Sequence, residues 1–303
     1  MKYLYGPVVS RRLGKSLGIN VTPYKTCTYS CVYCQLGYTT NKTVERKSYF
    51  DKNEILKEIK SLANRNISFD YLTFAGEGEP TLNKDLGVFI AEAKKYDLKV
   101  AVLTNGSLLW RSDVRNDLFE ADVVIPSLDA ASQDTFKKIN RPHESLVIDR
   151  IIDGLSAFSE EFDGKFYIEI MLVKGYNTHK EELTKIKEAI EKIKPDGVYL
   201  MIPTRPPTEK IEIPDYLDII KAETIIGKVT KILKPEVGEI SLMDDKNPKE
   251  GILSIIRRHP LRRDQLLELL KKYGLKMEEI ENEIEEMEFN NVKYYVISSK
   301  KKS

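Results

Sequence analysis

The chain has 303 residues, of which 41% are hydrophobic and 31% are charged, a balance that is typical of a globular protein and excludes a disordered or fibrous one. Its formal net charge of +1 provides no overall field that would attract nucleic acid or anionic lipid. No apolar stretch approaches the ~20 residues that span a bilayer, and the N-terminus lacks the apolar region of a signal peptide, so we expect no membrane partner and a cytoplasmic location.

Helical and strand patterns alternate along most of the chain. The expected strands lie near residues 18–21, 70–75, 99–104, 122–128, 166–173 and 198–202. The expected helices lie near residues 53–64, 84–96, 132–139, 145–158, 178–193 and 215–233. This alternation predicts βα units around a parallel sheet. Because six strands are too few for a closed eight-stranded barrel, we expect an α/β fold with a partial (β/α)6 TIM-like barrel over residues 1–240. Ligands should bind outside the carboxyl ends of its strands.

A second, small domain is expected over residues 246–303, after a polar stretch at 234–250 that contains two prolines. The patterns predict helices at 251–258, 261–273 and 277–288 and a β-like segment at 292–298, which together indicate a winged-helix-like domain. Residues 277–289 hold seven glutamates and no basic residue. A helix of that composition repels phosphate, so DNA is an unexpected partner. Docking of a protein, a peptide, the substrate or RNA stays open.

All three cysteines of the chain, Cys27, Cys31 and Cys34, fall in one C-x3-C-x2-C motif. An odd number in one cluster argues against a disulfide framework. Thiolates are the usual ligands of iron–sulfur clusters, and three of them can hold a [4Fe–4S] cube while leaving one iron open to a small molecule. Two alternatives are a buried helix face, for which the intervening residues are poor formers, and a zinc site, which usually takes four ligands.

The pattern C-x3-C-x-aromatic-C resembles the signature loop of the radical S-adenosylmethionine (SAM) superfamily. The resemblance implies an enzyme with one [4Fe–4S] cluster on three cysteines, whose open iron is chelated by the amino and carboxylate groups of SAM. One electron then cleaves SAM to methionine and a 5′-deoxyadenosyl radical, which abstracts a hydrogen atom from a substrate. It further implies that Tyr33 lies near the adenine and that the electron comes from a donor such as flavodoxin or ferredoxin.

Residues 75–82, A-G-E-G-E-P-T-L, follow a predicted strand and are similar to the Gly-Gly-Glu-Pro element of that superfamily. Glu77 stands where the first glycine of the element is usual. Glycines let a backbone come close to a ligand. The alternative is a Gly-rich βα turn that binds no ligand and has the same sequence pattern. The resemblance assigns four residues of this segment to SAM binding: Gly76, Gly78, Glu79 and Pro80.

Further polar and apolar residues follow the later strands. The resemblance implies SAM contacts through a second group of residues: Asn105, Ser127, Asp129, Arg141, Met201 and Ile202. It names three candidate contacts to the substrate: Thr104, Lys174 and Arg205. Two of these residues, Arg141 and Arg205, could clamp a carboxylate or phosphate. Turn formation and ordinary surface exposure are the alternatives for these positions.

Residues 6–20, G-P-V-V-S-R-R-L-G-K-S-L-G-I-N, resemble a motif of a single-cluster subgroup that is often grouped with wyosine-type tRNA modification enzymes. A more distant resemblance is to the GTP cyclase of molybdenum-cofactor biosynthesis. The chain has no further cysteine for an auxiliary cluster. The substrate stays open among a tRNA base, a peptide and a small molecule. Two other functions are weighed: an activating enzyme that makes a glycyl radical on a protein, and a non-enzymatic iron–sulfur sensor.

Overall fold

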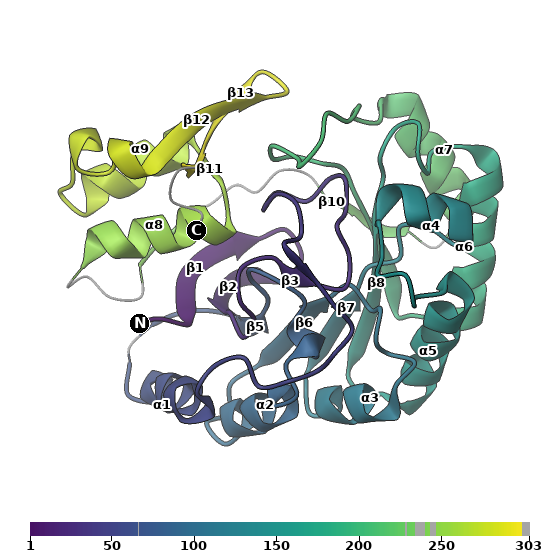
Figure 1. The fold of residues 1–303 in the computed structure, drawn as a ribbon, viewed down its shortest axis with the longest axis horizontal. Helices are drawn as coiled ribbons and strands as arrows, with labels where there is room; N and C mark the ends of the chain where they lie inside the picture. Colours follow the sequence, from purple (N-terminus) through teal and green to yellow (C-terminus); the bar gives the residue numbers. More distant parts are fainter. Residues whose placement is uncertain (66, 228, 234–239, 243–246, 299–303) are drawn as a thin grey trace.

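A mostly parallel sheet of eight strands forms the centre of the molecule in the computed structural model (Figure 1), which describes residues 1–65, 67–227, 229–233, 240–242 and 247–298. The strand order is β1-β2-β5-β6-β7-β8-β9-β10, and only the β1–β2 pair is antiparallel. The strands are β1 Leu4–Ser10, β2 Gly14–Ile19, β5 Tyr71–Phe74, β6 Val100–Thr104, β7 Val123–Pro126, β8 Lys165–Met171, β9 Gly197–Met201 and β10 Val229–Leu233. No pairing between β1 and β10 closes this sheet among the described residues, so the expected α/β fold is confirmed and is consistent with a partial barrel.

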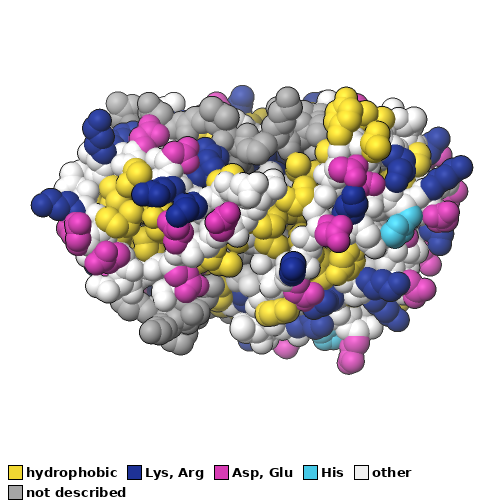
Figure 2. Space-filling view, turned by 90° about the horizontal axis from the view of Figure 1, so that it is seen from above, with side chains coloured by type: hydrophobic (Ala, Val, Ile, Leu, Met, Phe, Trp, Pro, Cys, Tyr) yellow, Lys and Arg dark blue, Asp and Glu magenta, His cyan; other side chains and the backbone are white. Residues whose placement is uncertain are grey.

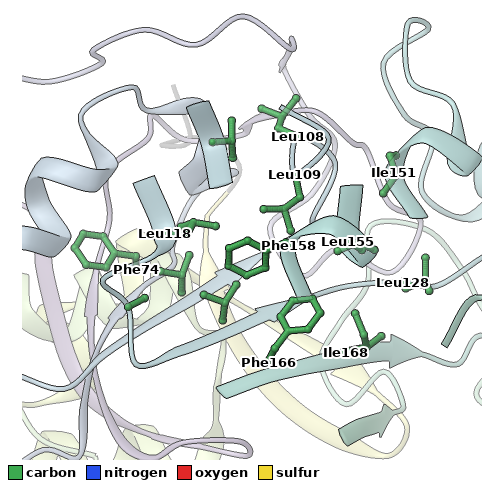
Figure 3. Close-up of a cluster of buried hydrophobic side chains, with 14 of the residues drawn as sticks. Phe74, Leu108, Leu109, Leu118, Leu128, Ile151, Leu155, Phe158, Phe166 and Ile168 are labelled. Carbon is green, nitrogen blue, oxygen red and sulfur yellow. The ribbon is translucent and has the colours of Figure 1, made fainter. Parts of the chain in front are cut away.

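Helices surround the sheet on its outer side, where Figure 1 shows them along the lower and right edges of the molecule. These helices are α1 Lys52–Leu62, α2 Leu86–Lys94, α3 Ser112–Leu118, α4 Gln133–Ile139, α5 Ile148–Glu161, α6 Lys180–Ile193 and α7 Tyr216–Ile226. The helix α5 presents Ile151, Leu155 and Phe158 at helical spacing to the core (Figure 3). The ring of Phe158 meets that of Phe166 on β8 edge-to-face at 5.3 Å between centroids. No helix in the described ranges is long and apolar enough to cross a membrane.

The predicted helix at 215–233 is wrong beyond Ile226. The helix α7 ends at Ile226, and Gly227 takes a left-handed conformation (φ 70°) that caps it. Residues Val229–Leu233 then form β10, which pairs in parallel with β9. The hydrophobic spacing of V-T-K-I-L fits either a helix or a strand, and the glycine is the local signal that separates them. The sheet therefore has one more parallel strand than the six expected, besides β1.

The C-terminal residues form a compact unit beside β1, at the upper left of Figure 1. It contains α8 Pro248–Arg258, α9 Arg263–Lys272 and a sheet of the order β11-β13-β12, with β11 Leu261–Arg262, β12 Ile284–Phe289 and β13 Val292–Ile297. Ile252, Leu266 and Ile280 contribute to its hydrophobic core, which Val8 of β1 joins. Much of the predicted boundary at 234–250 lies outside the described residues.

The predicted acidic helix at 277–288 is also wrong. Two 3-10 turns, Met277–Glu279 and Glu281–Glu283, lead into β12, which forms a hairpin with β13. Asn290 and Asn291 make the connection, both with positive φ (53° and 59°), as a two-residue hairpin turn requires. The winged helix is therefore not confirmed. The argument that an acidic helix at 277–289 would repel DNA loses its basis, because these residues do not form that helix.

Candidate cofactor and substrate site

The cysteine loop lies between β2 and α1 in the sequence. Hydrogen bonds to several other segments hold it in place. Cys27 ends the short strand β3 (Thr26–Cys27), which pairs with β4 (Asn41–Lys42). The backbone N–H of Val32 donates to the carbonyl of Ile139 at the end of α4 (3.0 Å). The hydroxyl of Thr208, beyond β9, donates to the carbonyl of Cys34 (2.6 Å). These bonds tie the cysteine loop to β4, to the end of α4 and to the segment that follows β9.

Nitrogen donors surround the three sulfur atoms. The Nζ of Lys25 donates to Cys34 Sγ (3.1 Å), and the Nδ2 atoms of Asn105 and Asn140 lie 3.5 Å from Cys27 Sγ and Cys31 Sγ. Burial raises the pKa of the Cys27 thiol to about 12 and that of Cys31 well above its ordinary value. Thiolates at these half-buried positions therefore gain from a compensating positive charge, which the irons of a cluster supply.

The donor set therefore fits a [4Fe–4S] cluster held by thiolates. A site for a single ion, formed by three convergent His, Cys, Asp or Glu side chains, is not found in the described part of the chain.

Glu79 ties the Gly-rich loop to the end of β6. Its carboxylate accepts hydrogen bonds from the backbone N–H of Thr81 (3.0 Å), the hydroxyl of Thr104 (2.5 Å) and the backbone N–H of Asn105 (2.7 Å). The side chain is only 2% exposed, and burial raises its pKa. The structure thus shows Glu79 and Thr104 bonded to each other, with Pro80 opening the 3-10 turn Pro80–Leu82.

Tyr33 and Asp129 connect the cysteine loop to the strand end after β7. The Tyr33 hydroxyl donates to Asp129 Oδ2, which also accepts from Asn140 Nδ2 (2.6 Å). The other oxygen of Asp129 accepts from the backbone N–H of Met171 (2.8 Å). Burial raises the pKa of Asp129 to about 6.

A cavity of about 350 Å³ opens beside the cysteine loop, within the ~300–1,000 Å³ range of small-molecule sites. Cys27, Cys34, Tyr33 and Arg205 line it, together with the loop 76–78. The sequence therefore identified residues from three separate segments, the cysteine loop, the Gly-rich loop and Arg205, that the fold brings to one cavity.

Other predicted site residues lie outside the lining of this cavity. They are Cys31, Glu79, Pro80, Thr104, Asn105, Ser127, Asp129, Arg141, Lys174, Met201 and Ile202. Ser127, directly after β7, forms an isolated parallel β-bridge with Glu169 on β8. Arg141 forms an ion pair with Glu209. Lys174 lines a different hollow between α6 and α7 and pairs with Asp215 (2.6 Å).

Sequence reasoning assigned no site role to several residues of the cavity wall, including the charged or titratable residues Arg11, Arg12, Lys25, Glu169, Arg258 and His259. Arg12 forms an ion pair with Glu169 and places Nη2 3.1 Å from the sulfur of Met201. The S-R-R run after β1 was a visible signal for the first two arginines. No local signal marks Arg258 and His259, because they belong to the C-terminal unit and reach the cavity only through its docking.

Comparison with known proteins places this geometry in a family. Residues 21–186 match the model of the radical SAM superfamily. The chain is 36% identical over 301 residues to a UPF0026 protein of Methanocaldococcus jannaschii, covering 97% of this chain and 94% of that protein. A UPF0026 protein of Synechocystis is 37% identical over 205 residues, covering 67% and 76% of the two chains.

A solved structure shares the fold. A radical SAM methyltransferase from Sphaerobacter thermophilus superposes with a TM-score of 0.53 at 15% sequence identity, covering 70% of this chain and 63% of that one. Membership of the superfamily implies SAM and a [4Fe–4S] cluster as cofactors. The cysteine loop, the Gly-rich loop and the family match together show that the chain belongs to the radical SAM superfamily, among relatives grouped as UPF0026 proteins.

Proposed function

We propose that this protein is an enzyme that cleaves SAM reductively at a single [4Fe–4S] cluster held by Cys27, Cys31 and Cys34, and abstracts a hydrogen atom from a substrate. The observation that carries the proposal is the shared cavity of Cys27, Cys34, Tyr33 and the Gly-rich loop. When bound, the cluster and SAM supply the one-electron chemistry that yields a 5′-deoxyadenosyl radical. The electron would come from a donor such as flavodoxin or ferredoxin.

The residues of the chain would bind and shield these cofactors. At Gly78, a Cβ atom would lie 2.1 Å from the carbonyl oxygen of Thr26, so only glycine lets the loop lie this close to the cysteine segment. Gly76 has a φ of 149°, which L side chains rarely adopt. The loop can therefore present backbone groups to the amino end of SAM. Leu103 and Met171 add apolar lining, which limits water beside a reactive radical.

One argument favours catalysis over a non-enzymatic sensor. A cluster-bearing sensor needs no cavity beside its cluster, whereas this chain has one. Modification of a tRNA base is the substrate reaction we favour, on the resemblance of the segment 6–20; activation of a protein as a glycyl radical enzyme is the alternative.

The test is the formation of 5′-deoxyadenosine. The full chain would be reconstituted anaerobically with iron and sulfide, then given dithionite and SAM. We expect about four irons per chain, as one cube contains, and 5′-deoxyadenosine by mass spectrometry. The Cys31→Ala variant should lose both signals, whereas Tyr38→Phe, at an exposed position, should retain them. No 5′-deoxyadenosine above the Cys31→Ala level would reject the proposal.

A further inference from the structure

The C-terminal unit forms part of the wall of the cofactor cavity. Arg258 is the last residue of α8 and His259 is its C-cap, and both line the cavity that contains Cys27 and Cys34. Gln35, next to the last cysteine, donates from Nε2 to the carbonyl of Arg258 (3.0 Å). The cysteine loop and the C-terminal unit are therefore in direct contact at this wall.

Arg205 joins the same contact from the loop after β9. Its Nη1 donates to Gln35 Oε1 (3.3 Å), and its Nη2 lies 2.7 Å from His259 Nε2. Gln35 from the barrel and His259 from the C-terminal unit thus hold the guanidinium group in place. A guanidinium fixed in this way loses little freedom when it binds a planar or tetrahedral anion.

The wall carries an excess of positive charge. Its cationic side chains are Arg11, Arg12, Lys25, Arg205 and Arg258, against two carboxylates, those of Glu77 and Glu169. The cofactors do not balance this excess: a [4Fe–4S]²⁺ core with three thiolates carries one negative charge, and SAM carries one positive charge. Figure 2 shows Lys and Arg interspersed with Asp and Glu on the outer face viewed from above, so the excess in the cavity is not part of a broad basic surface there.

Arg258 has an incomplete set of partners. The residue is 7% exposed, and its Nε lies 3.5 Å from Glu77 Oε1, which belongs to a residue that is also 7% exposed. Neither of these two atoms has a hydrogen-bond partner among the described residues. Its guanidinium also lies 5.0 Å from the ring centroid of Tyr5. Glu77 balances the charge of Arg258 without a hydrogen bond to its Nε, so an oxyanion in the adjoining cavity can supply the guanidinium with a further acceptor.

We propose that Arg205 and Arg258 bind an oxyanion of the substrate, a phosphate or a carboxylate, across the contact between the barrel and the C-terminal unit. Charge-assisted hydrogen bonds to paired arginines are the strongest that side chains offer to such groups. The C-terminal unit would then select the substrate as well as cover the cavity. This inference deepens the proposed function and rests on it for the identity of the neighbouring cofactors.

The test is calorimetric titration of the reconstituted full chain with inorganic phosphate and, in a separate arm, with acetate. We expect phosphate or acetate to bind, and Arg205→Gln to weaken that binding about tenfold, the loss of one charge-assisted bond. Arg258→Gln should do the same. Arg257→Gln removes the same charge from an exposed neighbour on α8 and should change binding less than about twofold.

Each outcome decides a separate question. Binding of phosphate alone or acetate alone identifies the anion, and binding of neither overturns the inference. Equal binding by wild type, Arg205→Gln and Arg258→Gln also overturns it. If Arg258→Gln fails to fold, the Glu77→Gln/Arg258→Gln pair removes both buried charges and takes its place. Formation of 5′-deoxyadenosine without substrate is measured in parallel. This assay tests the proposed SAM cleavage, whereas the titration tests anion binding, so the two proposals can fail independently.

Discussion

The hydroxyl of Tyr33 donates a hydrogen bond to the carboxylate of Asp129, and this bond joins the cysteine loop to the strand end after β7. The Tyr33→Phe variant keeps the ring and removes the bond. We expect it to lower the free energy of unfolding by about 1–2 kcal/mol, since Asp129 loses one buried donor. Urea denaturation would measure this. Tyr38→Phe, whose side chain is 58% exposed, is the matched control and should change stability little.

The same carboxylate predicts a pH dependence of stability. Burial raises the Asp129 pKa from 3.8 to about 6, so the folded protein holds the proton more tightly than the unfolded chain. Its contribution to stability is therefore complete below about pH 4 and is lost as the pH rises through about 6. The difference in unfolding free energy between wild type and Asp129→Asn should fall by about 2–3 kcal/mol over that window. A difference that grows with pH would contradict the assigned direction.

The Gly-rich loop should not tolerate a side chain at Gly78. An added Cβ would lie 2.1 Å from the Thr26 carbonyl oxygen and 2.8 Å from Thr22 Oγ1, so the loop must move away from the cysteine segment. We expect Gly78→Ala to weaken SAM binding by about tenfold or more, as measured by equilibrium dialysis. At Gly251 the nearest atoms are those of the Leu242 side chain (3.1 Å), which can shift, so Gly251→Ala should bind SAM normally.

Glu77 and Arg258 should be energetically coupled across the two units. Removing one charge leaves the other buried and unpaired, so Glu77→Gln or Arg258→Gln alone should cost about 3 kcal/mol of stability. The double variant should cost clearly less than the two single costs added together. Chemical denaturation of the four proteins gives the coupling energy. Strictly additive effects would show that the two charges do not interact.

Lys174 should be dispensable for SAM cleavage. It lies in a hollow between α6 and α7, where it pairs with Asp215 (2.6 Å) and Asp218 (3.5 Å), and it is not part of the cavity wall beside the cysteines. We expect Lys174→Ala to form 5′-deoxyadenosine within about twofold of the wild-type rate, because a solvated surface pair contributes little. A large loss of activity in a folded variant would place this lysine in the reaction after all.

Local patterns predicted the parallel strands and the helices that separate them, because the alternation of apolar residues along a βα unit depends on near neighbours. The two wrong helices share one cause. Apolar spacing in 215–233 and 277–288 fits a helix, but Gly227 ends the first and the Asn290–Asn291 turn pairs the second as a hairpin. Pairing with another strand then decided both outcomes: β10 pairs with β9, and β12 pairs with the adjacent strand β13.

The sequence by itself determined the superfamily of this protein, because three cysteines at short spacing and a Gly-rich segment are local features that need little of the fold to be recognised. Only the tertiary structure decided which side chains share the cavity with them. In the structure Glu79 is buried and hydrogen-bonded to Thr104 at the end of β6. Lys174 lines a different cavity, and Arg258 forms an ion pair with Glu77. Those contacts join residues far apart in the chain, and they form only when strand order and the docking of the C-terminal unit bring the residues together.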